Sequence, residues 1–293
     1  MALIRNAANK VRRGVVGQDT FYYTGGRQIV RQAKNNSNYG ESASRSVAQQ
    51  TRRVMWGNLV NTYQVIASFL PLAFGKQPSG QSSFTRYMQI NANVNPFPLT
   101  KDHAARGMIV PRGYIVSDGP LPSIEVNQGD LVDTAFRTSI QCTEVSQNNT
   151  IGELSTSILE DSDFKDGDNI GIIRIFSHTE SGLPAFAEAD YHELTLDTKS
   201  LATVSQAGLW DVCFFDNATL DISPKEDLVA CAVIHSRLIG SKLICSRQQI
   251  VVSTAVVEQR EALLASGYTR RAMESYGVDA EALITPLGRD LLY

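Results

Sequence analysis

The run Asn169–Phe176 reads Asn-Ile-Gly-Ile-Ile-Arg-Ile-Phe, and the run Leu228–Ile234 reads Leu-Val-Ala-Cys-Ala-Val-Ile. Both runs are short, strongly apolar and rich in β-branched residues, a composition that is typical of strands at the centre of a sheet. We therefore expect these two runs to be the central strands around which a β-sheet is built.

Shorter apolar runs recur on both sides of these two, between Met108 and Val252. Clusters of turn-forming residues separate them, for example Asn127-Gln128-Gly129-Asp130. Many short strands with turns about every ten residues predict an antiparallel β-sandwich over residues 103–253, with one short helix at Ile151–Glu160. The other runs are Met108–Val110, Tyr114–Val116, Ser123–Val126, Leu131–Ile140, Tyr191–Leu196, Gly208–Phe215 and Lys242–Val252.

Helices are predicted on both sides of this region. Residues 42–70 carry apolar side chains at three- and four-residue spacing, and Ser82-Ser83 can cap a second short helix after a turn. Residues 42–102 are therefore predicted to be a helical hairpin followed by a linker, and residues 254–293 a helical tail. The predicted fold class is mainly β with α-helical additions: a helical hairpin after an N-terminal basic arm, then an antiparallel β-sandwich, then a helical C-terminal tail.

The basic N-terminal arm, residues 1–41, contains a predicted β-hairpin. Thr20–Tyr23 and Arg27–Arg31 flank Gly25-Gly26, and glycine tolerates the positive φ of a tight hairpin turn. The polar residues 34–40 that follow offer little to bury. We expect the arm to lie on another surface rather than to form a core of its own.

Charge is segregated along the chain. The net charge is −3, but residues 1–53 carry +8 and residues 111–293 carry −14. A basic arm beside an acidic body favours contact with nucleic acid or with an acidic protein surface, which in a ring can be the body of the next copy. A solvated basic tail is the alternative interpretation.

Arginine and tyrosine are enriched at protein interfaces, and the same pair suits nucleic acid through phosphate contacts and base stacking. We favour protein contact, because the sequence shows no basic recognition helix and the rest of the chain is acidic. The terminal residues Leu291, Leu292 and Tyr293 are predicted to dock on another subunit or to pack on their own domain. The predicted interaction residues of the arm are Arg12, Arg13, Tyr22, Tyr23, Arg27, Arg31, Lys34, Arg52 and Arg53.

No motif indicates an enzyme. The histidines are well separated, and although His192-Glu193 and Asp211 could be imagined beside a serine, no nucleophile-elbow, phosphate-loop or zinc-protease motif occurs. The four cysteines lack metal-ligand spacing, so we expect buried free thiols. The acidic run Asp161–Asp168 has its glycine in the wrong register for a calcium loop and is predicted to be a solvated turn. We predict no catalysis, no cofactor and no metal.

Nothing in the sequence indicates membrane association. No run approaches the roughly 18 apolar residues of a membrane span, and the first residues lack the apolar region of a signal peptide. We therefore expect a protein that is made in a cytoplasm and has no membrane partner.

The order of several features resembles a known group of proteins. They are Tyr22-Tyr23 with Gly25-Gly26-Arg27 and Arg31, Ala48–Arg53, a segment containing Asn91, the run Gly167–Ile173, and Cys245-Ser246-Arg247-Gln248-Gln249-Ile250. This order resembles an uncharacterised group of Bacteroidota and Bacteroidota-phage proteins and is similar to virion proteins of crAss-like phages. The chain departs from that pattern at Asn35-Asn36-Ser37 and in the helical extension after Ser253.

The resemblance implies a non-enzymatic virion component made in the bacterial host, with the virion as its location. It implies a ring protein of the tail or of the portal–tail connector, whose partners are copies of itself and neighbouring portal or tail ring proteins. A head-decoration or cargo protein stays open, and so does a β-sandwich that binds carbohydrate or a host surface. The last would need an aromatic platform from Tyr114, Phe186, Tyr191 or Trp210.

Overall fold

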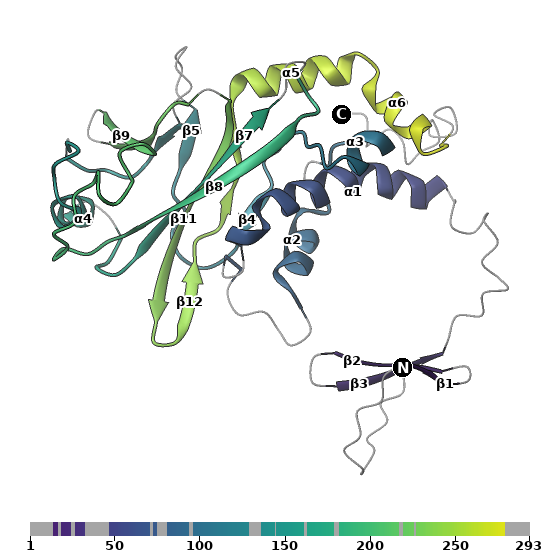
Figure 1. Cartoon of the computed structure of the whole chain (residues 1–293), viewed down its shortest axis with the longest axis horizontal. Helices are drawn as coiled ribbons and strands as arrows, with labels where there is room; N and C mark the ends of the chain where they lie inside the picture. The colour runs from purple at the N-terminus through teal and green to yellow at the C-terminus, as the bar shows by residue number, and fades with distance from the viewer. Residues whose placement is uncertain are drawn as a thin grey trace, which may run out of the picture.

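The chain forms two larger antiparallel sheets with helices packed against one of them, together with a small N-terminal sheet (Figure 1). This confirms the predicted class, a mainly β fold with α-helical additions. The computed structural model describes residues 14–16, 19–24, 27–32, 47–70, 73–74, 81–93, 96–128, 136–143, 145–160, 163–178, 182–216, 219–225 and 227–278.

The central sheet consists of β12 (Lys242–Cys245), β11 (Leu228–Ile239), β7 (Asn169–His178) and β8 (Phe186–Thr195), hydrogen-bonded in that order. All neighbours run antiparallel, and β14 (Val251–Val252) also pairs with β11. The two apolar runs that were expected to be central strands are the middle of this sheet, which confirms that prediction.

One face of the central sheet packs against a second sheet, so that the predicted sandwich is present. The second sheet has the order β5-β6-β10-β9. The helix α4 (Ile151–Glu160) has the predicted bounds and belongs to the same apolar core. The strands are β5 (Val126–Gln128), β6 (Phe136–Thr138), β10 (Thr219–Ile222) and β9 (Cys213–Asp216).

The other face of the central sheet is covered by helices, which adds a third layer. Side chains alternate along β7, so Ile170 and Ile172 face the second sheet whereas Ile173 and Ile175 face the helices. The helices of this layer are α1 (Val47–Ile66), with the 3₁₀ turn η3 (Ala67–Phe69), and α2 (Ser83–Asn91). The hydroxyl of Ser82 accepts a hydrogen bond from the amide of Thr85, as the predicted helix cap requires.

The C-terminal helices α5 (Thr254–Ala265) and α6 (Tyr268–Ser275) also pack onto the body. Gly267, between them, has a φ of +76°. The buried side chains of α6 share a third apolar cluster with α1 and with Phe97. A short helix, α3 (Lys101–Ala105), begins within the predicted linker because the hydroxyl of Thr100 caps it.

Two smaller ladders complete the described strands. Near the start of the chain, β1 (Gly14–Val16), β2 (Asp19–Thr24) and β3 (Arg27–Gln32) form an antiparallel sheet in that order. Thr24 pairs with Arg27, which confirms the predicted hairpin. In the body, β4 (Ile115–Ser117) pairs with β13 (Gln248–Gln249).

Buried asparagines join the helical layer to the extended chain beneath it. The amide of Asn58 on α1 donates to the carbonyl of Val110 at 2.9 Å and accepts from the amide of Val110 at 2.7 Å. Asn91 on α2 makes the same two bonds with Ile115, each at 2.8 Å. Each side chain thus replaces a strand partner for a buried backbone segment. Asn58 also donates to the buried hydroxyl of Tyr114 at 3.0 Å.

The substitution Asn58→Ala should lower the free energy of unfolding by about 3 kcal/mol, because it leaves both backbone groups of Val110 and the Tyr114 hydroxyl unsatisfied. Urea denaturation followed by tryptophan fluorescence measures this change. Gln64→Ala on the exposed side of the same helix is the matched control, and it should change stability by less than about 0.5 kcal/mol. Equal effects of the two substitutions would contradict the role given to Asn58.

Candidate interaction surfaces

The structure places part of the predicted basic arm on adjacent strands. Tyr22 and Tyr23 lie on β2, and Arg27 and Arg31 lie on β3, with Tyr22 opposite Ile29 in the register. The sheet therefore brings these four positions close together along the backbone. Three predicted arm residues, Arg12, Arg13 and Lys34, lie outside the described residues, as do the tail residues Leu291, Leu292 and Tyr293. Their proposed contacts stay predictions.

The β1–β3 sheet has apolar side chains but no covering layer among the described residues. Phe21 lies opposite Val30 on one face of the sheet, Ile29 points to the other face, and all three side chains are half-buried. None of the three apolar clusters formed by the described residues includes a residue of this sheet. A sheet normally buries its apolar face against a second layer. This sheet is therefore a candidate contact surface.

A second candidate surface lies on α1. Arg52 and Arg53 are exposed, and Nη1 of Arg53 donates to Oε1 of Gln50 at 3.4 Å. One turn later, the side chain of Trp56 is 44% exposed. Arginine and tryptophan are the residues most often found at the energetic centre of interfaces. The sequence reasoning missed Trp56, although an aromatic residue outside the apolar spacing of the helix is a usable signal.

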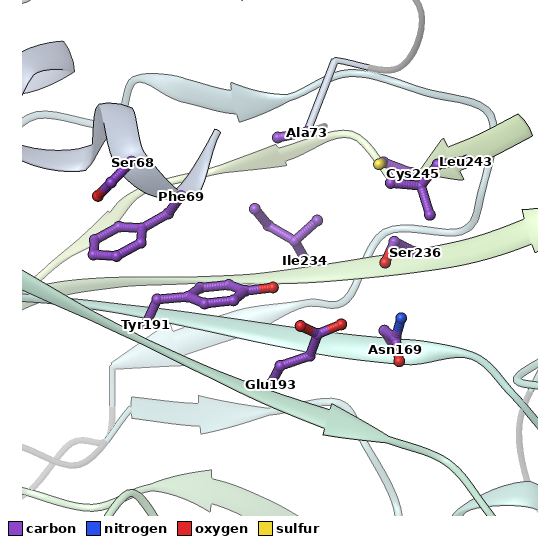
Figure 2. A pocket seen from close by; sticks show the side chains of 10 residues that line it. All are labelled: Ser68, Phe69, Ala73, Asn169, Tyr191, Glu193, Ile234, Ser236, Leu243 and Cys245. Carbon is purple, nitrogen blue, oxygen red and sulfur yellow. The ribbon is translucent and has the colours of Figure 1, made fainter. Parts of the chain in front are cut away.

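A cavity of about 330 Å³ lies where the helical layer ends, above the central sheet (Figure 2). Its aromatic wall is the ring of Tyr191 on β8, which stacks on Phe69 with 5.5 Å between centroids and 17° between planes. Gly171 on β7 permits this position, because a Cβ there would lie 2.7 Å from the Tyr191 hydroxyl oxygen. The lining residues are Ser68, Phe69, Ala73, Asn169, Tyr191, Glu193, Ile234, Ser236, Leu243 and Cys245.

The polar groups of this cavity have unused hydrogen-bonding and charge capacity. Glu193 is exposed and forms no ion pair with any described residue. The Oδ1 atom of Asn169 is buried and has no hydrogen-bond partner among the residues that the structure describes. Burial, with smaller contributions from nearby Glu193 and Cys245, raises the pKa of Tyr191 to about 12, so its hydroxyl stays protonated at neutral pH.

His192 and Asp211, which we considered as possible catalytic partners, lie near each other around Arg174. Arg174 is buried and pairs with Asp190 at 2.6 Å, and Asp211 contributes only its backbone carbonyl to it, at 3.2 Å. Nε2 of His192 lies 3.3 Å from Nη2 of Arg174. No serine or cysteine hydrogen bond to His192 occurs among the described residues, and the Asp190 and His192 side chains are about one-third exposed.

The prediction of a solvated turn at Asp161–Asp168 was wrong for its last residue. Asp168 is buried, and its carboxylate accepts two hydrogen bonds of 2.7 Å from Arg237 and lies 2.8 Å from Nε2 of His235. Both partners come from β11, which lies beside β7 in the sheet. Burial acts to raise the pKa of Asp168, but the hydrogen bonds from Arg237, His235 and the Lys165 amide outweigh it and lower that pKa.

The remaining predictions about single residues concern the four cysteines and the aromatic side chains that could bind carbohydrate. All four cysteines are buried free thiols, as expected, and burial raises the pKa of Cys142 and Cys245 to about 11. Tyr114, one of the four residues from which a carbohydrate platform would have to come, is wholly buried against Asn58 and is therefore excluded as part of one. The other three candidates are 36–46% exposed: Phe186, Tyr191 and Trp210.

Among the described residues, no group of three or more histidine, cysteine or acidic side chains could hold a metal ion. None of the helices described here is long and apolar enough to cross a membrane. Comparison with protein-family models, curated protein sequences and solved structures gives no match to this chain.

The stability of the chain should fall in acid partly through Asp168. Because its folded-state pKa lies below the unfolded value of about 3.9, its ion pairs contribute stability above that pH, and this contribution is lost as the pH falls through the folded pKa. Asp168→Asn should cost about 3 kcal/mol at pH 7, since Arg237 then lacks its partner, and should flatten the acid dependence. Thermal unfolding between pH 7 and pH 2 measures both effects.

The exposed Asp163, on the same turn, gives the control Asp163→Asn. This variant should follow the wild-type stability at every pH. An acid dependence of Asp168→Asn as steep as that of the wild type would show that other carboxylates account for the loss.

Proposed function

We propose that this chain is a non-enzymatic structural subunit of a tailed-phage virion. In this proposal it is a ring protein of the tail or of the portal–tail connector, and its copies associate through their terminal segments. The resemblance of its ordered motifs to virion proteins of crAss-like phages provides the virion setting. The structural observations below support the proposed mode of association.

The observation that carries the proposal is the β1–β3 sheet. Its side chains Phe21 and Val30 share one face of the sheet and are half-buried, and no second layer covers that face within the described chain. Small sheets gain independent stability only when an apolar face packs on something. A neighbouring subunit provides that layer in a ring, where every copy gives one arm and receives another.

The charges fit the same arrangement. Residues 1–53 carry +8 and the region 111–293 carries −14, so the arm of one copy is attracted to the body of the next. The exposed Arg52, Arg53 and Trp56 on α1 extend this basic segment onto the surface of the folded body. Such residues supply anchors for a protein partner.

The proposal predicts a salt-sensitive oligomer. Light scattering at low salt should give a discrete mass that is a multiple of the 32.1 kDa chain mass. The mass should fall at about 1 M salt, where the screening length shrinks to about 3 Å. A monomer at every salt concentration would contradict self-association and would favour the carbohydrate-binding or host-surface alternative.

Deletion of residues 1–40 should abolish the oligomer and leave the body folded, because the described cores contain no residue from this segment. The deleted chain should unfold cooperatively at a temperature close to that of the full chain, with the mass of a monomer. Normal oligomers from the deleted chain would exclude the arm as the means of association, even if the protein is a ring subunit.

A further inference from the structure

We infer that the cavity beside Tyr191 and Glu193 receives an arginine side chain from residues 1–13 of a second copy. This inference rests on the proposed assembly through basic arms and names the place on the neighbouring body that an arm occupies. The cavity and the arm segment are matched in charge, in hydrogen-bonding groups and in apolar contacts.

The charge match comes from Glu193. It projects from an edge strand, β8, and has no ion-pair partner among the described residues, whereas Asp168 and Asp190 are paired with Arg237 and Arg174. In Figure 2 the Glu193 carboxylate and the Tyr191 hydroxyl point into the same space. A carboxylate at the edge of a partly apolar cavity attracts a cation more strongly than one surrounded by water.

The aromatic wall favours arginine among the possible cations. The Tyr191 ring lies close to the backbone of Gly171 and stacks on Phe69, and the residue as a whole is 36% exposed to solvent. A guanidinium group is planar, stacks on aromatic faces and is more weakly hydrated than an ammonium group. Its five N–H donors also suit a site that is rich in acceptors.

Two acceptors come from different strands, the Glu193 carboxylate from β8 and the Ser236 hydroxyl from β11. In Figure 2 the side-chain nitrogen of Asn169 on β7 is turned toward Ser236, and its buried oxygen is turned the other way. The volume of about 330 Å³ is at the lower end of the range for small-ligand sites and accommodates one long side chain.

Residues 1–13 are the segment that best fits such a site. They contain Arg5, Lys10, Arg12 and Arg13 and no acidic residue. Their apolar residues Leu3, Ile4 and Val11 can contact the rim, where Leu243 lines the cavity and pairs with Leu238 on β11, which is 63% exposed. A basic and apolar peptide thus meets an acidic and apolar surface.

A charge exchange between full-length variants tests the inference. The pocket variant carries Glu193→Lys, and the arm variant carries Arg12→Glu and Arg13→Glu. Each variant alone should assemble at least about tenfold more weakly than the wild type in light scattering, because like charges then meet in the cavity. An equimolar mixture should recover the wild-type oligomer mass, since each variant then supplies the charge that the other lacks.

The matched control is Glu188→Lys, the same charge change on an 81% exposed side chain of the same strand, outside the cavity. It should assemble like the wild type. Circular dichroism should show that Glu193→Lys unfolds at a temperature similar to that of the wild type, because Glu193 has no ion-pair partner to lose among the described residues. Glu188 lies 3.6 Å from His178, an exposed pair whose loss should change stability little. Tyr191→Leu, which keeps the charges and removes the aromatic face, should also weaken assembly.

The outcomes separate the inference from the proposed function. If the wild type forms oligomers and Glu193→Lys forms oligomers of the same mass and strength, the inference is overturned and the assembly proposal stands. If each single variant assembles more weakly and the mixture does not recover the wild-type mass, the arm occupies the cavity of its own copy. That result would overturn the binding of an arm from a second copy. A wild type that is monomeric under all conditions would overturn both.

Discussion

The arrangement of the body depends on two buried side-chain amides. Asn58 and Asn91 each form a two-bond pair with the backbone, at Val110 and Ile115, on either side of the buried ring of Tyr114. Backbone groups at these positions would otherwise be buried without partners, which costs as much as a lost hydrogen bond each. The amides therefore fix where α1 and α2 lie on the sheet, more specifically than apolar packing alone would.

The position of the helical layer in turn decides where the sheet is left uncovered. Beyond η3 no helix of the described residues covers the face of β7, β8 and β11, and the cavity occupies that place (Figure 1, Figure 2). Tyr191 covers part of the gap by lying over Gly171, where the lack of a Cβ allows ring and backbone to approach closely. The cavity is thus a consequence of how far the helices extend.

Local sequence signals predicted much of the fold. The two apolar runs form β7 and β11, and α4 has the expected bounds. A strand that is buried on both faces appears in the sequence as a continuous apolar run, and a helix appears as apolar residues at three- and four-residue spacing. The first half of β8 was missed, since an edge strand alternates exposed and half-buried side chains and contains Glu188 and Asp190. The cavity could not be predicted from local sequence patterns, because its lining residues lie between Ser68 and Cys245 in the sequence and come together only in the folded chain.

The formal charge of −14 over residues 111–293 overstates how much of the body attracts a basic partner. Asp168 and Asp190 are held by Arg237 and Arg174, so their fields are largely cancelled inside the protein. The carboxylate of Glu193, in contrast, has no ion-pair partner among the described residues and lies beside the Tyr191 ring in the cavity. Sequence-level net charge measures long-range attraction, whereas specific binding requires an unpaired charge at a site that can exclude water. Whether a given carboxylate is paired depends on whether a neighbouring strand brings an arginine close to it. The sequence alone does not show this, because the pairing of the strands is a property of the folded chain.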